Sequence, residues 1–316
     1  MIVITGAGGF IGGRLSLYFN QLGYHDLVLV DNFRDKGKLE RAMRIPKAQC
    51  VDRTHFFDWA YQNANRVNAV FHLGARTNTA EKDEEMLNVL NVEYSQKIWL
   101  LCCELGWPLL YASSAATYGD GSLGYKDDPE EIKQLQPLNP YGWSKQHFDQ
   151  WVMDQKEKPW YWVGLKFFNV YGPGESHKGR MASVVYHAQQ QIKDLGYLTL
   201  FRSHHPEFED GCQKRDFIFV DDVCRLMLWL MEHRKIGGIL NAGSGTAQTF
   251  LDLAHAVFKS LGKRSDIRFI DTPEDIRPYY QYYTQADMSR IQKSGYPMPM
   301  ETLESGIEKY MQELHL

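Results

Sequence analysis

The sequence predicts an α/β protein with a doubly wound parallel sheet and a smaller, mixed α/β lobe in its C-terminal half. Short apolar runs rich in β-branched residues alternate with stretches of helical spacing as far as residue 170, which is the pattern of successive βαβ units. These runs are apolar throughout rather than at every second position, as expected for strands covered on both faces. Beyond residue 170 the alternation becomes looser, and this change predicts the second lobe.

The elements can be placed in order from the N-terminus. Residues 1–5 read as a strand and residues 10–23 as a helix, because Phe10, Leu15 and Phe19 share one helical face. Further strands are expected at 26–32, 68–75, 107–115 and 161–170, with helices at 83–105 and 140–156. In the second half we expect helices at 181–194, 221–233, 249–261 and from about 300, with strands at 197–201, 216–220, 237–243 and 267–270.

Composition excludes several classes of protein. The chain has 316 residues, of which 44% are hydrophobic and 23% charged, as in an ordinary soluble enzyme. A net charge of −4 gives no field that would attract nucleic acid, and no apolar run reaches the roughly 18 residues that cross a membrane. Met1 leads straight into a strand, so we expect no signal peptide and a cytoplasmic protein. The five cysteines lack C-x-x-C spacing, which favours buried free thiols over disulfides or a metal site.

In "TGAGGFIG", after the first strand, Gly6, Gly9 and Gly12 form a G-x-x-G-x-x-G motif. A dinucleotide pyrophosphate needs this close backbone approach at a helix N-terminus, although a glycine-rich turn also occurs without a ligand. Asp31 stands nineteen residues after Gly12, at the end of the second strand, as in a Rossmann-type fold. We therefore expect residues 1–168, with an interleaved stretch at about 217–245, to form the nucleotide-binding domain, and 169–216 with 246–316 to form the substrate lobe.

Asp31 alone suggests a ribose diol and hence NAD. Lys38 and other cations follow it closely, and Arg53 comes further along the chain. These cations would neutralise a 2′-phosphate that a lone carboxylate repels. We favour NADP, with NAD as the alternative.

Tyr141 and Lys145 stand at i and i+4 just inside a helix that begins at "NP", so they share a face. A neighbouring ammonium favours the phenolate of a tyrosine, which otherwise is a poor base at neutral pH. Ser114, at the end of the strand expected at 107–115, is able to hydrogen-bond the same substrate oxygen. These three groups around one carbinol suit reversible hydride transfer. Alternatively, Tyr141 and Lys145 are simply two exposed residues on a helix, without a catalytic role.

"TGAGGFIG", "SSAATYG", "YGWSK" and "FFNVYGPG", in this order, resemble the extended short-chain dehydrogenase/reductase family over essentially the whole chain. The resemblance implies that Ser114, Tyr141 and Lys145 form the catalytic triad and that the C-terminal lobe holds a nucleotide sugar. Ala115 and Ala116 follow the triad serine, where the dehydratases of the family carry an Asp-Glu pair, so elimination is disfavoured.

"YASSAATYG", "FNVYGPGESHKGRMASVVYH", "KRDFIFVDDV" and "YTQAD" are similar to the branch whose members invert C6″ of ADP-heptose in the synthesis of lipopolysaccharide precursors. This implies an isomerase that forms a transient 6″-ketone with bound NADP, and a homo-oligomer, a pentamer by resemblance. Inversion requires a second acid/base group opposite the tyrosine. Lys178, in "HKG", matches the second base of that branch.

The resemblance also implies two sets of contacts. The cofactor set comprises Gly6, Gly9, Phe10, Ile11, Gly12, Asp31, Asn32, Lys38, Arg53, Leu73, Gly74, Ala75, Arg76, Thr77, Asn91, Lys145, Val170 and Lys178. The substrate set comprises Ser114, Asn169, Arg180, His187, Phe201, Arg202, Ser203, His204, Arg215 and Tyr280. His187 is equally read as an ordinary helix histidine, and Arg215 as a salt-bridge partner of Asp216 or Asp221.

The chain departs from the pattern of the branch in three places. Lys166 replaces an arginine, Arg180 replaces a small residue, and the loop at 202–214 is longer than expected. These departures leave room for a 4-epimerase or reductase of another nucleotide sugar. A dinucleotide-sensing regulator on the same fold is disfavoured, since all three triad positions are kept.

Overall fold

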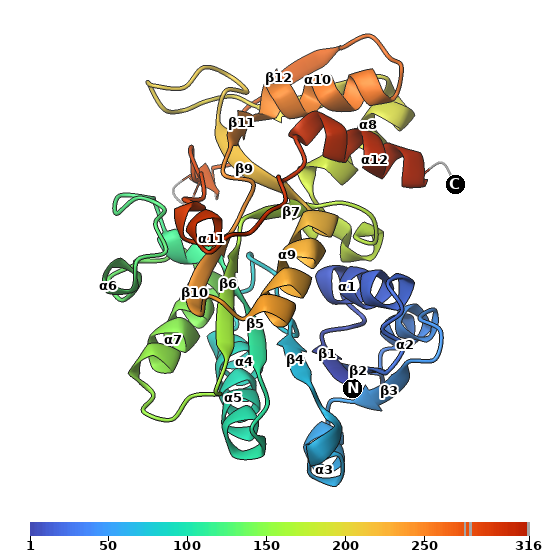
Figure 1. Cartoon of the computed structure of the whole chain (residues 1–316). Helices are drawn as coiled ribbons and strands as arrows, with labels where there is room; N and C mark the ends of the chain where they lie inside the picture. The colour runs from blue at the N-terminus through green and yellow to red at the C-terminus, as the bar shows by residue number, and fades with distance from the viewer. Residues whose placement is uncertain (275, 278–279, 315–316) are drawn as a thin grey trace.

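The computed structural model describes residues 1–274, 276–277 and 280–314. Its centre is a seven-stranded sheet in which every neighbouring pair is parallel (Figure 1). In spatial order the strands are β10 (Gly238–Ala242), β6 (Trp162–Phe167), β5 (Leu109–Ser114), β4 (Ala69–His72), β1 (Ile2–Thr5), β2 (Leu27–Asp31) and β3 (Gln49–Asp52). The predicted doubly wound α/β fold is confirmed.

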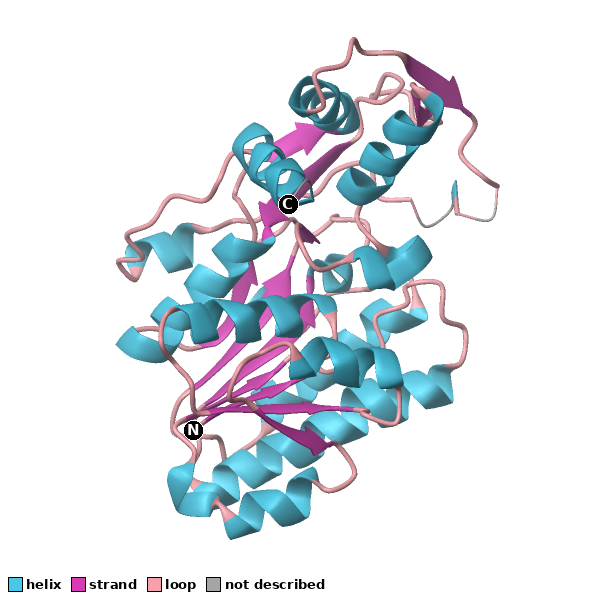
Figure 2. Ribbon diagram, turned by 90° about the vertical axis from the view of Figure 1, so that its right-hand side faces the viewer, coloured by secondary structure: helices cyan, strands magenta, loops and turns pink. Residues whose placement is uncertain are grey.

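Helices cover both faces of this sheet, as Figure 2 shows. One face packs against α1 (Phe10–Gln21), α2 (Lys36–Met43) and α9 (Val220–His233), the other against α3 (Phe56–Gln62), α5 (Tyr94–Leu105) and α7 (Pro140–Asp154). Each face has its own buried apolar cluster, which explains why the strands are apolar throughout. The short elements are η1 (Ala64–Arg66), η3 (Ala115–Tyr118), α6 (Pro129–Ile132) and α11 (Ser289–Lys293).

The expected helix at 83–105 is not uniform. It consists of α4 (Glu84–Leu87), a π-helical turn η2 (Asn88–Glu93) and α5. The wider turn contains Asn91, which is fully buried and hydrogen-bonds the backbone of Arg76 and the hydroxyl of Ser144. Such π-turns often occur at functional sites, and the apolar spacing of the sequence does not reveal them.

The C-terminal lobe has a third apolar cluster and two small sheets. One sheet contains β7 (Asn169–Tyr171), β9 (Lys214–Phe219) and β11 (Ala247–Thr249), and the other β8 (Leu198–Phe201) and β12 (Ile267–Ile270). Around them lie α8 (Val184–Leu195), α10 (Phe250–Ser260) and α12 (Leu303–Leu314), at the top of Figure 1. The turn η4 (Ser176–Met181) precedes α8. Across the described ranges, no helix combines the length and the apolar character needed to cross a membrane.

Two expected elements in this region have different boundaries. The strand expected at 161–170 is two strands, since β6 belongs to the large sheet and β7 to the small one. Phe168 separates the two strands. The helix expected from residue 181 begins at Val184 because Ser183 caps it, accepting a hydrogen bond from the backbone of Tyr186.

Candidate active site

The glycine turn joins β1 to α1 and is built for close backbone approach. Gly6 has φ 71°, and a Cβ there would lie 2.6 Å from the backbone nitrogen of Gly74. A Cβ on Gly12 would lie 2.3 Å from the carbonyl oxygen of Gly6, so neither position tolerates a side chain. A Cβ on Gly9, in contrast, would meet only the Gly6 carbonyl oxygen, at 3.1 Å. The N-terminus of α1 therefore has open space where a pyrophosphate would bind, and the turn fits a dinucleotide.

Asp31 supports this turn from the end of β2. Its Oδ2 accepts from the backbone N–H of Gly8 at 3.0 Å, and its Oδ1 accepts from Asn32 N–H and from Lys38 Nζ, both at 2.7 Å. Arg41 Nε donates to the carbonyl oxygen of Gly8 at 2.8 Å. The carboxylate thus has a structural role besides any contact with a ribose. Sequence reasoning missed Arg41, because only the fold brings α2 onto the turn.

The segment after β4 lies beside the glycine turn, because β4 is next to β1 at the point where the strand order reverses. His72 bridges Thr5 Oγ1 at 2.7 Å and Ser95 Oγ at 2.9 Å, and burial lowers its pKa to about 3, so it is neutral. The Thr5 hydroxyl also accepts from Gly74 N–H at 3.2 Å. These bonds, with those of Asn91, fix the stretch from Leu73 to Thr77 beside the glycine turn.

Tyr141 and Lys145 lie on α7, which begins at the cap Asn139. Both are buried, with 8% and 5% of their surface exposed. Burial raises the pKa of the Tyr141 phenol, and a hydrogen bond with the Ser114 side chain lowers it. Lys145 Nζ donates to the carbonyl oxygen of Ala112 at 2.9 Å, and burial lowers its pKa to about 8. Hydroxyl, phenol and ammonium are therefore together at the carboxyl end of β5.

Lys178, on the turn η4, lies beside the glycine turn. Its ammonium lies 5.5 Å from the centroid of the Phe10 ring, at the start of α1. The turn is held by Glu175, which is fully buried and accepts from Gly172 N–H and from the backbone and hydroxyl of Ser183. Burial lowers the pKa of Lys178, and the charge of Glu175 raises it. Sequence reasoning did not identify Glu175, whose partners lie on both sides of the turn.

Arg215, on β9, is 8% exposed and lies between two aromatic rings. Its guanidinium carbon is 5.3 Å from the Tyr280 ring centroid and 5.7 Å from that of Phe250, and it donates to backbone carbonyls of Lys214 and Gln281. The salt-bridge interpretation of Arg215 is wrong within the described residues. Asp216 accepts from backbone and hydroxyl groups, and Asp221 pairs with Arg14.

The other residues expected to contact the cofactor or the substrate are spread over several elements. Asn32 and Arg53 follow β2 and β3, and the Arg53 N–H donates to the carbonyl oxygen of Asp31. Asn169 and Val170 lie on β7, and Phe201 ends β8 with its ring 6.3 Å from that of Tyr280. Arg180, His187 and His204 are exposed. Arg202 pairs with Asp210 and Asp271, and the Ser203 N–H bonds Asp210, so the long loop is partly occupied with its own contacts.

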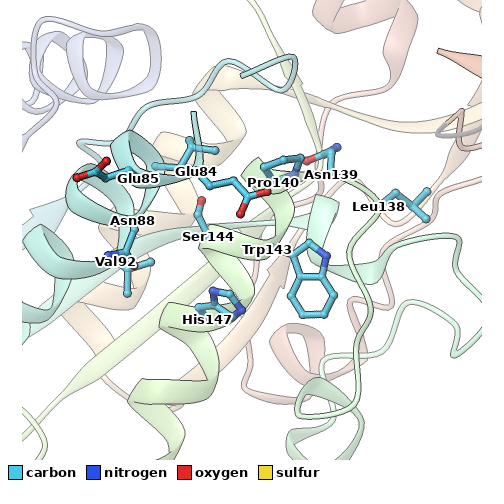
Figure 3. A pocket seen from close by; sticks show the side chains of 11 residues that line it. Glu84, Glu85, Asn88, Val92, Leu138, Asn139, Pro140, Trp143, Ser144 and His147 are labelled. Atoms are coloured by element: carbon cyan, nitrogen blue, oxygen red, sulfur yellow. The ribbon is translucent and has the colours of Figure 1, made fainter. Parts of the chain in front are cut away.

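A cavity of about 590 Å³ lies on the outer side of α7 (Figure 3). Ser144 and His147 line it together with residues of α4 and η2. Tyr141 and Lys145, on the same helix, do not line it. This cavity is therefore separate from the catalytic groups.

Comparison with known proteins agrees with this geometry. Residues 2–243 match the NAD dependent epimerase/dehydratase family. The chain belongs to this family. The site accordingly takes a nicotinamide cofactor. The match spans both the glycine turn and the Tyr141–Lys145 pair, the two features expected to hold and to use that cofactor.

Within the family, the expected similarity to the ADP-heptose branch is confirmed. The ADP-L-glycero-D-manno-heptose-6-epimerase of Fusobacterium nucleatum is 41% identical, with 99% of this chain and 97% of the relative covered. The enzyme of the same name from Nitratidesulfovibrio vulgaris is 41% identical, with 99% and 97% covered. The crystal structure of the Helicobacter pylori ADP-L-glycero-D-manno-heptose-6-epimerase is 26% identical, covers 99% of this chain and 96% of its own, and has a TM-score of 0.83.

Proposed function

We propose that this epimerase interconverts ADP-D-glycero-D-manno-heptose and ADP-L-glycero-D-manno-heptose by inversion at C6″. The observation that carries the proposal is the presence of two acid/base groups on separate elements. Tyr141 lies with Lys145 and Ser114 at the end of β5, and Lys178 lies against Phe10 at the glycine turn. A dehydrogenase needs one such group, whereas inversion through a ketone that turns over in the site has a use for a second group where the oxygen comes to lie.

Tyr141 and Ser114 act on one face of the sugar. The phenolate takes the proton of the C6″ hydroxyl while the Ser114 hydroxyl hydrogen-bonds the same oxygen. Lys145, as ammonium, stabilises the phenolate. The burial of the pair strengthens this interaction, because a low-dielectric site screens charges less than water does.

Lys178 acts on the opposite face. After the 6″-ketone has turned over in the site, its ammonium returns a proton to the carbonyl oxygen as the carbon is reduced, and the roles are exchanged for the reverse epimer. Its lowered pKa suits a group that must both give and take a proton near neutral pH. A bound nicotinamide would supply reversible hydride chemistry at C6″, with no net oxidation of the sugar.

We further propose NADP as the cofactor. Lys38 keeps about a third of its side chain exposed (34%) while paired with Asp31, which leaves its ammonium accessible to a 2′-phosphate. Arg53 follows β3, and its backbone N–H donates to the carbonyl oxygen of Asp31. In Lys38→Met and Arg53→Met we expect the affinity for NADP to fall about tenfold more than that for NAD, measured by fluorescence titration. Equal losses for both dinucleotides would favour NAD.

The ADP moiety is proposed to bind in the C-terminal lobe. Arg215 supports this, because its buried guanidinium is a suitable partner for a diphosphate. Phe201 and Tyr280 provide aromatic surface beside it. We also propose the two-lobe division, with residues 1–168 and about 217–245 in one lobe. We further propose a homo-oligomeric assembly, whose mass light scattering would measure.

Incubation of the purified protein with either epimer, without added cofactor, tests the function. Proton NMR should show both epimers at equilibrium, and in D2O the hydrogen on C6″ should remain protium because it is carried as hydride. The Tyr141→Phe protein serves as the blank. Net accumulation of a reduced or 4-epimerised sugar, or deuterium at C6″, would overturn the proposal.

A further inference from the structure

Asp149 and Lys166 form an ion pair that the proposed chemistry does not use. Lys166 Nζ lies 2.7 Å from Asp149 Oδ2, and both side chains are 0% exposed. Asp149 lies on α7 and Lys166 on β6, the strand next to β5 in the sheet. The pair is thus enclosed between the catalytic helix and the strand that ends in Ser114.

Both members of the pair are hydrogen-bonded to their surroundings. Asp149 also accepts from Tyr111 OH at 3.0 Å and from Ser113 Oγ at 2.6 Å. Lys166 Nζ also donates to Thr117 Oγ1 at 2.6 Å and lies 5.4 Å from the centroid of the Tyr118 ring. Every donor and acceptor named here is on β5, η3, β6 or α7.

Each branch of this network ends beside a catalytic group. Asp149 is one helical turn after Lys145 and two turns after Tyr141, on the same face of α7. Ser113 directly precedes Ser114, and Thr117 Oγ1 donates to the Ser114 carbonyl oxygen at 2.8 Å. One ion pair therefore connects the helix that carries the phenol and the ammonium to the strand end that carries the hydroxyl.

Stability is a poor explanation for such a pair. Removing two charges from water is costly, and replacing a buried ion pair with apolar residues is often neutral or stabilising. The pair instead fixes the orientation of the groups around it, because both charged groups are hydrogen-bonded on several sides. We propose that Asp149 and Lys166 are positioning residues, which hold Ser114 and α7 in register and set the charge environment of Lys145.

A small number of titratable groups face Lys145. Asp149 faces it from its own helix and raises its pKa against the effect of burial. Neutral His72 faces it from β4, and Tyr141 lies one turn away on α7. Tyr111, Tyr118 and Asp127 are the other titratable groups near the pair. Removal of the Asp149 charge should therefore lower the pKa of Lys145.

Kinetics test the positioning role, which rests on the proposed epimerase function. Lys166→Met, Asp149→Asn and the double variant should each lose at least tenfold in kcat with KM within about twofold, and Lys166→Arg should recover most of the loss. The matched control is Lys133→Met, which removes an exposed ion pair to Asp154 on the same helix. Since the double variant leaves no unpaired charge, it serves if a single variant fails to fold. Parent-like kcat in the double variant would overturn the proposal.

A second measurement does not depend on turnover. The protein is labelled with 13Cε-lysine, and the Lys145 signal is assigned by its absence in Lys145→Met. This signal should titrate at lower pH in Asp149→Asn and in the double variant than in the parent. An unchanged titration would mean that the pair does not act on Lys145. If the parent itself does not interconvert the two sugars, the proposed function fails while this titration still decides the role of the pair.

Discussion

Tyr141 and Lys178 have matching roles in the proposed inversion, but they are held in different ways. Tyr141 is the second residue of a 15-residue helix and is 8% exposed. Lys178 is on a six-residue 3-10 turn and is partly buried. The first is fixed by a regular element packed on the main sheet. The second depends on the contacts of a single buried carboxylate, Glu175.

This difference matches the freedom of the two side chains. A tyrosine has two rotatable bonds and needs a rigid backbone to reach a fixed oxygen. A lysine has four, and its flexible stem allows its ammonium to reach a sugar that has turned over between two half-reactions. We infer that the helix fixes where oxidation occurs, and that the turn has only to bring Lys178 within reach of the opposite face.

The largest expected effect comes from removing either base. Tyr141→Phe and Lys178→Met should each lower kcat by about 10²- to 10⁴-fold, the usual contribution of a positioned acid or base. ADP binding, measured by calorimetry, should stay within about twofold. Lys193→Met, an exposed lysine on α8, is the control for loss of charge. Full activity in Lys178→Met would remove that residue from the mechanism.

The pH dependence of kcat should identify the contribution of the Tyr141–Lys145 pair. Lys145 supports the Tyr141 phenolate only while protonated, so with a pKa of about 8 kcat should fall above about pH 8, by up to tenfold per unit. Lys145→Met should be slower at all pH values and should lack this alkaline decline. A decline near pH 8 that persists in Lys145→Met would assign it to another group.

The parts of the site that follow local rules were open to prediction from the sequence. The glycine turn after β1 and the i, i+4 spacing of Tyr141 and Lys145 depend on residues close in the chain, so their patterns are readable. The strand runs were also readable, since strands buried on both faces must be apolar along their whole length.

Other features depend on contacts that only the fold creates. Lys166 stands where an arginine was expected, but nothing in its sequence context indicated a buried pair with Asp149. Arg41 and Glu175 are ordinary charged residues in the sequence, and their roles come from groups that the fold brings against them. The π-turn at Asn91 was missed for the same reason, because its polar partners are 15 and 53 residues away.

Glu175→Gln tests how Lys178 is held. The amide would present N–H to donors that now share a carboxylate, and loss of the charge should lower the pKa of Lys178 further. We expect about a tenfold fall in kcat with a lower thermal midpoint, since disrupted buried hydrogen bonds typically cost about 1–3 kcal/mol. Glu308→Gln, exposed on α12, is the control. If Glu175→Gln has a lower thermal midpoint but the kcat of the parent, the Glu175 carboxylate stabilises the protein without positioning Lys178.

Asn139→Ala tests the helix side and should have the smallest effect on catalysis. Asn139 Oδ1 accepts from Gly142 N–H at 2.8 Å, and loss of a helix cap costs about 1 kcal/mol. The thermal midpoint should fall by about 2 °C, whereas kcat should change less than twofold, because Lys145 and Ser144 still hold α7 through Ala112 and Asn91. Asn139→Asp keeps the cap and should match the parent in both measurements. A tenfold loss of kcat in Asn139→Ala would mean that the cap itself sets the position of Tyr141, and the contrast between a rigid helix base and an adjustable turn base would fail.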